Sequence, residues 1–442
     1  MTADLNTRPS ALDDAVAATA EATATLEASA STATAEPVVH GGDALSRRQR
    51  AGLVLLLGAL VALGPFTIDM YLPAFPDVAA DLATTEAAIQ LTLTATMIGF
   101  GLGQLILGPL SDAVGRKVPL LAATAIHVLA SVSVIFAQDV TAVMIGRVFQ
   151  GIGAAGAAVV AMAMVRDLFS GQKLIRTLAR MALVTGLAPV LAPVIGAQVL
   201  SFVQWRGVFV VLAAYGLVVT VIAGIALAET LPADRRGAFE WRVVSGRYRV
   251  LIADRTFLGV LLVGSMVFSA LFSYLSSSSF ILQDGYGLTS QQFAFVFGIN
   301  AVGLVVCNQV GARLMRRLAP RAVMTFGLTV MAIGALALLT SALLGLGLVG
   351  VLVPLFFTVA PLGFVMPAVQ VLALADHPKE AGTAASMLGA VNFGVAGLIS
   401  PLVGLLGISV IAMGVVMCAA LAVAHLSLWL VVRPRVSSEV LV

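Results

Sequence analysis

The stretch A-G-L-V-L-L-L-G-A-L-V-A-L-G-P-F-T-I-D-M-Y-L-P-A-F-P, Ala51 to Pro76, decides the fold of this chain. It is long and apolar enough to cross the roughly 30 Å hydrocarbon core of a bilayer as a helix. Towards its far end it carries one acid, Asp69. A carboxylate in hydrocarbon costs roughly 2.5–3.5 kcal/mol on insertion scales, so such a group is a candidate functional residue. The alternative interpretation of Asp69 is an acid at the membrane interface that reaches solvent or caps a neighbouring helix.

The composition extends the membrane interpretation to the whole chain. Of the 442 residues, 60% are hydrophobic and 11% are charged, and the mean hydropathy is +1.04. A water-soluble chain of this length has no means of burying so much apolar surface, so the solvent must be lipid. The two cysteines, Cys307 and Cys418, lie within apolar runs, which predicts small core residues and no disulfide framework.

Between Ala51 and Val432 the hydropathy pattern predicts twelve membrane spans, and therefore an all-α membrane protein. The predicted spans are 51–75, 88–111, 119–138, 140–165, 177–201, 206–230, 255–283, 291–314, 322–343, 345–371, 381–405 and 406–432.

The basic residues predict the topology. Of the 25 Lys and Arg residues, all except Arg147 and Arg206 fall in the tails or in alternate loops, which is the distribution expected of cytoplasmic segments. Both termini are therefore expected in the cytoplasm. The net charge of +3 reflects this topology and not an anionic partner, so we do not expect nucleic acid binding.

The chain divides into two similar halves. A hydrophilic segment after the sixth span, residues 231–254, predicts a cytoplasmic central loop between six-helix bundles at 47–230 and 255–432. Residues 1–46 lack aromatics and a strong apolar stripe, which predicts a disordered cytoplasmic tail, with an amphipathic helix within Ala11 to Ala30 as the alternative. Residues 433–442 are predicted to form a second cytoplasmic tail. Two six-helix bundles around a site at the membrane midplane, exposed alternately to each side, are typical of secondary transporters.

Several motifs carry a family resemblance. The sequence G-x-L-x-D-x-x-G-R-K, Gly108 to Lys117, resembles the loop signature of the major facilitator superfamily, and the motifs I-D-M-Y-L-P-A-F-P, R-V-F-Q-G-I-G-A-A-G-A-A, M-V-R-D, L-A-P-V-L-A-P-V-I-G and E-T-L-P resemble its Bcr/CflA drug-resistance branch. The resemblance covers residues 50–432, with departures at Ala113 and Ala197. It implies a monomeric drug:proton antiporter of the cell (inner, or plasma) membrane that is driven by the proton gradient and needs no cofactor.

Asp69 and Arg147 are the predicted proton-coupling pair. Asp69 precedes Asp77 by eight residues and Arg147 follows Asp139 by eight, which places both roughly 12 Å from the same membrane boundary. If both spans face the cavity, as the resemblance implies, a direct or water-bridged contact is feasible, although equal depth alone does not establish one. The alternative for Arg147 is a structural role in which its five donors bind backbone carbonyls.

The loop signature predicts a conformational switch at Asp112, Gly115, Arg116 and Lys117, whose charges are expected to latch one half against the other. The resemblance places Asp112 near the N-terminus of the eleventh span, where a helix dipole favours negative charge. Topology anchoring alone is the alternative for Arg116 and Lys117.

A second motif predicts an antiporter kink. Pro189 and Pro193, with Gly186 and Gly196, are expected to bend or loosen the fifth span. A packing feature without a role in exchange is the alternative.

Substrate contacts are predicted from aromatic and amide side chains within the spans, which suit a largely apolar ligand. Lipid contact or helix packing is the alternative for each aromatic residue. The candidates are Phe66, Tyr71, Gln150, Phe272, Tyr274, Asn300, Asn392 and Phe393.

These features predict an efflux transporter that exchanges small amphipathic or apolar drugs for protons, one proton per cycle. The sequence has no phosphate-loop motif, no cluster spaced for metal binding and no nucleophile with a base, so we expect neither an enzyme nor a metal. A transporter of one specific metabolite, or a channel or non-transporting receptor, are the rival hypotheses.

Overall fold

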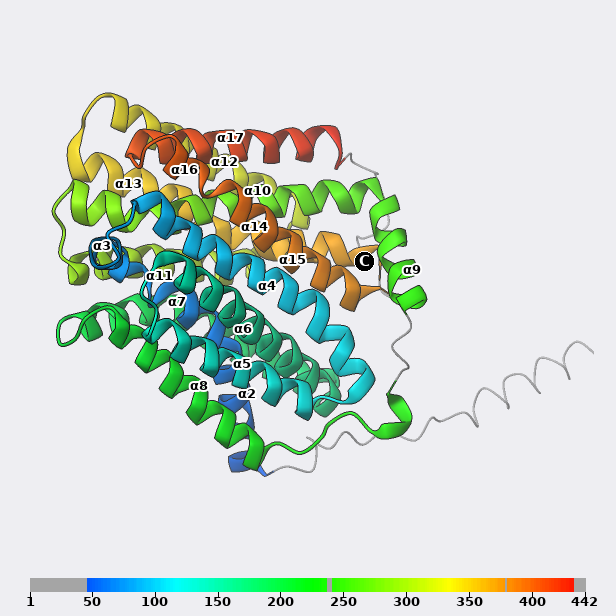
Figure 1. The fold of residues 1–442 in the computed structure, drawn as a ribbon. Helices are drawn as coiled ribbons and strands as arrows, with labels where there is room; N and C mark the ends of the chain where they lie inside the picture. Colours follow the sequence, from blue (N-terminus) through cyan, green and yellow to red (C-terminus); the bar gives the residue numbers. More distant parts are fainter. Residues whose placement is uncertain (1–45, 237–240, 378–379, 433–442) are drawn as a thin grey trace, which may run out of the picture.

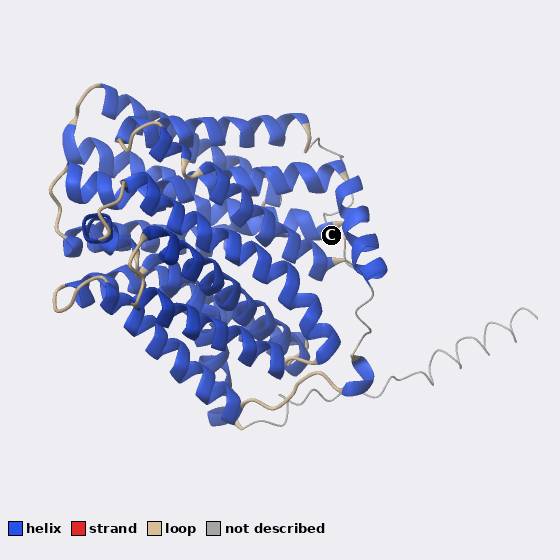
Figure 2. Ribbon diagram, in the orientation of Figure 1, coloured by secondary structure: helices blue, strands red, loops and turns tan. Residues whose placement is uncertain are grey.

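A computed structural model describes residues 46–236, 241–377 and 380–432, and the regular structure in these ranges is helical (Figure 2). They contain twelve helical segments long and apolar enough to cross a membrane, which confirms the predicted fold class and span count. The N-terminal half comprises α2 (Arg47–Asp69), η2 (Leu72–Ala74), α3 (Phe75–Asp81), α4 (Glu86–Val114), α5 (Lys117–Ile135), α6 (Val140–Leu168), α7 (Gly171–Leu200) and α8 (Arg206–Ala226). The C-terminal half comprises α10 (Arg255–Phe280), η4 (Ile281–Gly285), α11 (Ser290–Leu314), α12 (Pro320–Leu343), α13 (Gly347–Val359), α14 (Leu362–Ala375), α15 (Ala381–Ile399), α16 (Leu402–Leu405) and α17 (Val410–Leu430).

Capping residues fix where many of these helices begin. Ser46 and Gln49 form a capping box at the start of α2, and Thr289 with Gln292 does the same for α11. Asp139 accepts a hydrogen bond from a backbone N–H in the first turn of α6. Such caps satisfy N–H groups that have no partner within the helix, which matters most at a membrane boundary.

Three of the predicted spans are interrupted in the structure. The first span breaks directly after Asp69, where α2 gives way to η2 and α3; the tenth breaks at Pro361 and the eleventh at Pro401. Proline at such positions cannot donate a backbone hydrogen bond and clashes with the preceding turn. The break after Asp69 therefore puts this acid at a helix end, deep in the protein.

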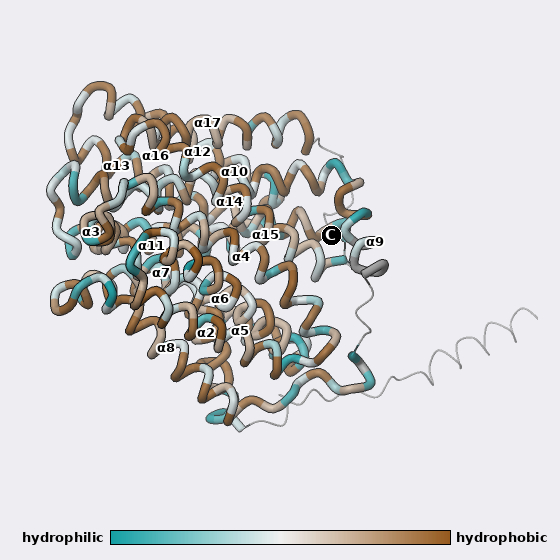
Figure 3. The backbone as a smooth tube through the Cα atoms, in the orientation of Figure 1, coloured by the Kyte–Doolittle hydropathy of each residue, from teal (hydrophilic) through white to brown (hydrophobic). Residues whose placement is uncertain are grey.

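The two halves lie against each other, α2–α8 on one side and α10–α17 on the other, with α9 (Trp241–Ala253) at one end (Figure 1). Two helix pairs form the seam between them, α4 with α15 and α7 with α11. Small residues let these helices approach: a Cβ at Gly101 would lie 3.3 Å from the carbonyl oxygen of Ala390. Hydrophobic colour covers most of the helices and hydrophilic colour gathers near their ends and on α9 (Figure 3).

The ends of the spans differ in charge. Arg47 begins α2, Arg116 separates α4 from α5, and Arg313 closes α11, all at one end of the molecule, which we call the basic end. Arg206, the exception among the loop arginines, lies at the opposite end, where its guanidinium bonds to Asp81 at 2.6 Å. That pairing explains why a cation is tolerated there.

At the opposite end the two halves are in contact. The side-chain amide of Gln283 donates to the carbonyl oxygen of Pro73 at 3.1 Å, and the rings of Phe75 and Phe280 lie 5.7 Å apart. This part of the seam is therefore closed.

Some predicted boundaries need adjustment. The twelfth helix begins at Val410, not at residue 406, because Ser409 caps it. The predicted central loop contains the helix α9, which contacts α10 and α15. The assignment of the domain boundaries stays a prediction, and the tails predicted at 1–46 and 433–442 lie, apart from residue 46, outside the described residues.

Candidate functional site

Asp69 is buried at the end of α2. Its side chain is 5% exposed, and the described part of the chain supplies it with no hydrogen bond and no ion pair. The Asp69 carboxylate lies close enough to Tyr274, on α10 of the other half, for the two groups to interact electrostatically. Asp69 therefore faces the seam between the halves without a fixed counter-charge.

Arg147, on α6, is fully buried inside the N-terminal half. Its Nη1 donates to the carbonyl oxygen of Thr67 at 2.8 Å and to Oε1 of Gln150 at 3.0 Å, and its guanidinium lies 4.8 Å from the ring centre of Tyr71. Thr67 and Tyr71 flank Asp69 in the sequence. Arg147 thus binds the Thr67 carbonyl, two residues before Asp69, and contacts the Tyr71 ring, two residues after it.

Among the described residues no direct hydrogen bond or ion pair joins Asp69 to Arg147, and a water-bridged contact stays a prediction. The hydrogen bonds of Arg147 go to Thr67 and Gln150 of its own half, whereas Asp69 interacts electrostatically with Tyr274 of the other half. The alternative role for Arg147, as a ligand of a backbone carbonyl, describes the observed bond to Thr67. Whether the two side chains face each other depends on the rotation of each helix about its own axis, and sequence separation and depth do not give that rotation.

A buried polar network extends from Arg147 to a residue that the sequence did not single out, His127 of α5. His127 Nε2 lies 2.8 Å from Thr67 Oγ1, and Gln150 Nε2 donates to Ser131 Oγ at 2.7 Å. Ser131 Oγ in turn donates to the carbonyl oxygen of His127 at 2.7 Å. Isolated polar residues within apolar spans were the available signal, because buried polar groups require partners.

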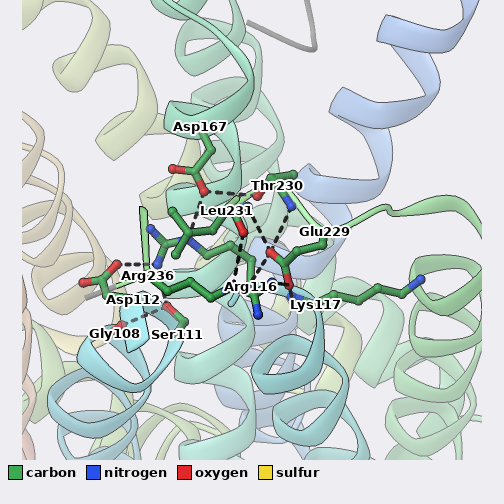
Figure 4. A network of polar contacts seen from close by, with 10 residues as sticks. All are labelled: Gly108, Ser111, Asp112, Arg116, Lys117, Asp167, Glu229, Thr230, Leu231 and Arg236. Atoms are coloured by element: carbon green, nitrogen blue, oxygen red, sulfur yellow. Dashed lines mark hydrogen bonds and ion pairs between the residues drawn. The ribbon is translucent and has the colours of Figure 1, made fainter. Parts of the chain in front are cut away.

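The predicted switch residues form a compact ion-pair cluster at the basic end (Figure 4). The Arg116 guanidinium bonds to Asp112 at 2.5 Å, to Ser111 at 2.8 Å and, through Nε, to Asp167 of α6 at 2.9 Å. Two acids and a hydroxyl thus surround one arginine, which ties the loop between α4 and α5 to the end of α6.

Glu229, which follows α8, completes this cluster. Its carboxylate accepts backbone N–H bonds from Arg116 at 2.8 Å, Lys117 at 3.1 Å, Thr230 at 2.9 Å and Leu231 at 3.0 Å. Partial burial acts to raise the pKa of Glu229, but these four donors outweigh burial and lower that pKa below its ordinary value. The E-T-L-P motif was the signal for this residue, although the sequence alone gave it no role.

Gly115 makes room for that carboxylate. Its φ is +102°, and a Cβ at this position would lie 2.5 Å from Glu229 Oε2. Only glycine satisfies both the conformation and the contact. The Lys117 side chain extends away from the cluster, so its contribution here is its backbone N–H (Figure 4).

The described contacts of the cluster stay within the N-terminal half and the start of the central segment. We expected a latch between the halves, with Asp112 near the eleventh span. The Asp112 side chain is 66% exposed, and its described partner is Arg116, not α15. In this structure Arg116 forms its ion pair with Asp112 within the N-terminal half.

The fifth span is one helix, α7, from Gly171 to Leu200 with both prolines inside it, and the predicted bend and its role in exchange stay predictions. The glycines of the motif allow close packing. A Cβ at Gly196 would lie 2.2 Å from the carbonyl oxygen of Met70, and one at Gly186 would lie 3.3 Å from Val305 of α11. The motif therefore supports the residue next to Asp69 and one of the seam contacts.

Among the predicted substrate residues, those of the C-terminal half line or approach the seam. Asn300 donates to the Tyr274 hydroxyl at 3.2 Å, and Phe393 stacks on Phe100 of α4 with ring centres 4.9 Å apart. Asn392 accepts from Ser265 at 3.0 Å and Phe272 packs against Phe393 at 6.1 Å. Of this group, Phe393 contacts the N-terminal half through Phe100, and Tyr274 interacts electrostatically with Asp69.

The three candidates of the N-terminal half lie in its interior. Phe66 packs on Tyr215 at 5.3 Å, Tyr71 stacks under Arg147, and Gln150 belongs to the polar network. Their described partners are all protein groups of the same half, so a substrate role for them stays a prediction. No group of three or more potential metal ligands occurs in the ranges that the structure covers.

Comparisons with known proteins agree with this architecture. Residues 55–401 match the model of the Major Facilitator Superfamily. The chain is 31% identical to the uncharacterized MFS-type transporter YdgK of Bacillus subtilis, over 89% of this chain and 98% of that protein. It is 29% identical to a bicyclomycin resistance protein homolog of Haemophilus influenzae, over 79% of this chain and 88% of that protein.

Among solved structures, the partially occluded, inward-open xylose transporter XylE of Escherichia coli has a TM-score of 0.68 at 12% identity, covering 87% of this chain and 99% of that one. At this identity the match concerns the fold alone. With its twelve spans, its signature cluster and these relatives, the chain belongs to the Major Facilitator Superfamily, a family of transporters and not of enzymes.

Proposed function

We propose that this protein exports small amphipathic or apolar drugs in exchange for protons, with Asp69 as the proton-carrying group. The observation that carries the proposal is the burial of Asp69 at the seam without a described hydrogen bond or ion pair. A buried carboxyl with no counter-charge is more stable in the neutral form, whereas a hydrated one ionises. Access of water to the seam would therefore control whether Asp69 holds its proton.

Alternating access supplies that control. In this structure the halves are in contact at the end opposite the basic end, through Gln283 with Pro73 and Phe75 with Phe280. When these contacts separate, the seam next to Asp69 would open to the other side of the membrane and its carboxyl would exchange its proton there. The basic end is proposed to face the cytoplasm, in accordance with the usual orientation of cationic loops.

Arg147 is proposed to position Asp69 and not to bond to it. Its hydrogen bond to the Thr67 carbonyl and its contact with the Tyr71 ring hold both neighbours of the acid. The side chain of Asp69 is then free to face substrate. The aromatic and amide groups around Tyr274, Asn300 and Phe393 provide an apolar wall with few polar groups, which suits drug-like molecules.

One proton per cycle suffices energetically. A membrane potential contributes about 2.3 kcal/mol per charge per 100 mV, and tenfold accumulation costs about 1.4 kcal/mol. One net charge therefore sustains roughly a forty-fold substrate gradient. The proposal of a single proton rests on Asp69 being the one acid at this depth in the first half.

The test compares Asp69→Asn with Asp77→Asn, a matched change to an exposed acid eight residues further along. We expect drug-induced proton release from purified wild type and from Asp77→Asn, and none from Asp69→Asn, which should still bind drug. Normal pH-driven efflux by Asp69→Asn in vesicles would refute the proposal.

The breadth of substrate needs its own measurement, because the fold is shared with a xylose transporter. We expect several unrelated toxic compounds to drive proton release. A response to one metabolite only would instead favour a specific transporter of that metabolite.

A further inference from the structure

The structure has a cavity of about 720 Å³ at the basic end, between the first turns of α2 and the N-terminal half of α7. Four arginines line it, Arg47 and Arg50 from α2 and Arg176 and Arg180 from α7. The other lining residues are apolar, among them Leu55 and Val184, and no acid belongs to the lining that the described residues form. None of the transport residues discussed above takes part in it.

The positive charges of these arginines are unfavourably placed relative to one another and to the helix dipole of α2. Arg47 and Arg50 lie in the first turn of α2, where the helix dipole favours negative charge and no acid is present, and Arg176 and Arg180 lie further along α7. Guanidinium groups that line one cavity repel each other, and an anion bound among them offsets that repulsion. The geometry thus matches a group with several acceptor oxygens, and arginine binds phosphate in this way.

Next to the cavity lies an exposed apolar surface. On α7, Leu183, Leu187, Leu191 and Val194 follow Arg180 at helical spacing and are between 46% and 56% exposed. On α2, Leu55 within the cavity is 67% exposed. Large apolar side chains left open along a membrane span are covered by acyl chains. A ligand for this site therefore combines an anionic head with a hydrocarbon tail.

We propose that this arginine cavity binds the phosphate headgroup of an anionic phospholipid of the membrane leaflet at the basic end, with one acyl chain along the exposed leucines of α7. The proposal concerns binding alone and is independent of the transported substrate and of Asp69.

The test uses the purified full-length chain in mild detergent, with dioleoyl phosphatidylglycerol titrated and bound lipids counted by native mass spectrometry. The double variant Arg176→Gln with Arg180→Gln removes two lining charges. The matched control, Arg316→Gln with Arg317→Gln, removes two exposed charges that follow α11 and lie outside the cavity lining.

We expect the cavity variant to bind the first phosphatidylglycerol about 30-fold more weakly, since each arginine near the membrane surface contributes about fivefold. The control should change by less than about threefold. Equal weakening in both variants, or none in the cavity variant, would overturn the proposal. Replacing the same two residues by lysine should restore most of the affinity and shows that the site is folded.

Two further arms identify the source of the anion. Inorganic phosphate should fail to displace the lipid, and dioleoyl phosphatidylcholine should bind far more weakly than phosphatidylglycerol. Displacement by phosphate would assign the site to a soluble anion, and equal binding of the two lipids would remove the role of the arginines; either result contradicts the proposal.

The chain itself offers a rival occupant, because residues 1–45 contain seven acids and one arginine. Replacing those seven acids by their amides should leave lipid affinity unchanged. Tighter lipid binding after that change would show that the N-terminal segment occupies the cavity, and the proposal would then be wrong.

Discussion

Arg147 shows how one buried side chain can act through geometry as well as charge. Its planar group serves two acceptors, Thr67 O and Gln150 Oε1, while it covers the Tyr71 ring. Lysine keeps the charge but lacks the fixed fork of donors. The polar groups that depend on Arg147 would then lose partners in a fully buried setting.

We therefore predict that Arg147→Lys abolishes transport and lowers the free energy of unfolding by about 2 kcal/mol, the scale for hydrogen bonds to a charged group. Arg206→Lys is the control, because Arg206 pairs with Asp81 in a partly exposed position, and it should change stability by less than about 1 kcal/mol. Unfolding in detergent and uptake in vesicles measure the two effects. Wild-type transport by Arg147→Lys would show that the charge alone suffices.

Gly115 gives a second prediction for a single residue. Gly115→Ala should destabilise the protein by about 1–3 kcal/mol, because the backbone conformation is strained for other residues and because the new Cβ would displace Glu229. Gly171→Ala is the matched control, since Gly171 also has a positive φ of 52° but a Cβ added there would meet no atom within 4 Å. Equal shifts in melting temperature for the two variants would mean that the contact with Glu229 is unimportant.

At the scale of elements, Glu229 joins the end of α8 to the start of α5. Its folded-state pKa is lowered below the ordinary value of 4.5 by four N–H donors, despite partial burial. The stabilisation it provides is therefore complete above about pH 4.5 and is lost as the pH falls through the folded-state pKa. Protonation removes the attraction for the N–H groups that hold the loop.

We predict that Glu229→Gln lowers the melting temperature at neutral pH, and that the difference from wild type narrows as the pH falls below about 4. Other carboxyls titrate in both proteins, so the difference isolates Glu229. Hydrogen exchange should also accelerate at the amides of Arg116 and Lys117. A difference that stays constant or widens on acidification would contradict this role.

The whole molecule must move for a seam-lining acid to reach both sides. Phe75 of α3 and Phe280 of α10 meet across the closed end, with ring centres 5.7 Å apart. We predict that a Phe75→Cys, Phe280→Cys double variant loses transport when a short reducible reagent joins the two thiols, and recovers it after reduction. The two single variants control for labelling, and the native Cys307 and Cys418 are only partly exposed. Full transport by the cross-linked protein would exclude opening at this end.

Much of the fold was predictable because hydropathy and capping act locally. The run at Ala51–Pro76 indicated a span, and the structure has one there. The break at Pro361 was not predicted, since proline is tolerated inside α7 at Pro189 and Pro193 and interrupts other spans. Whether neighbouring groups can satisfy the freed backbone is a property of packing, and the sequence of one helix does not contain it.

The site was predictable in part for the same reason. Asp69 stood out because an acid in an apolar run is costly wherever the helix lies. Glu229 and His127 did not acquire roles, because their partners, Arg116 and Thr67, are far away in the sequence. The arginine cavity depends likewise on two helices that begin more than a hundred residues apart.

By itself, the sequence determined that the chain is a twelve-span membrane protein, which charged residues lie within apolar spans, and which end of the spans is basic. These properties follow from the free energy of transfer of each residue from water to lipid, which depends on the residue and not on its neighbours. The tertiary structure alone decided that Arg147 holds the backbone beside Asp69 without contacting the acid, and that Arg116 is bound within its own half. Those outcomes depend on how packed helices are rotated about their axes, and that rotation is set by contacts between segments distant in the chain.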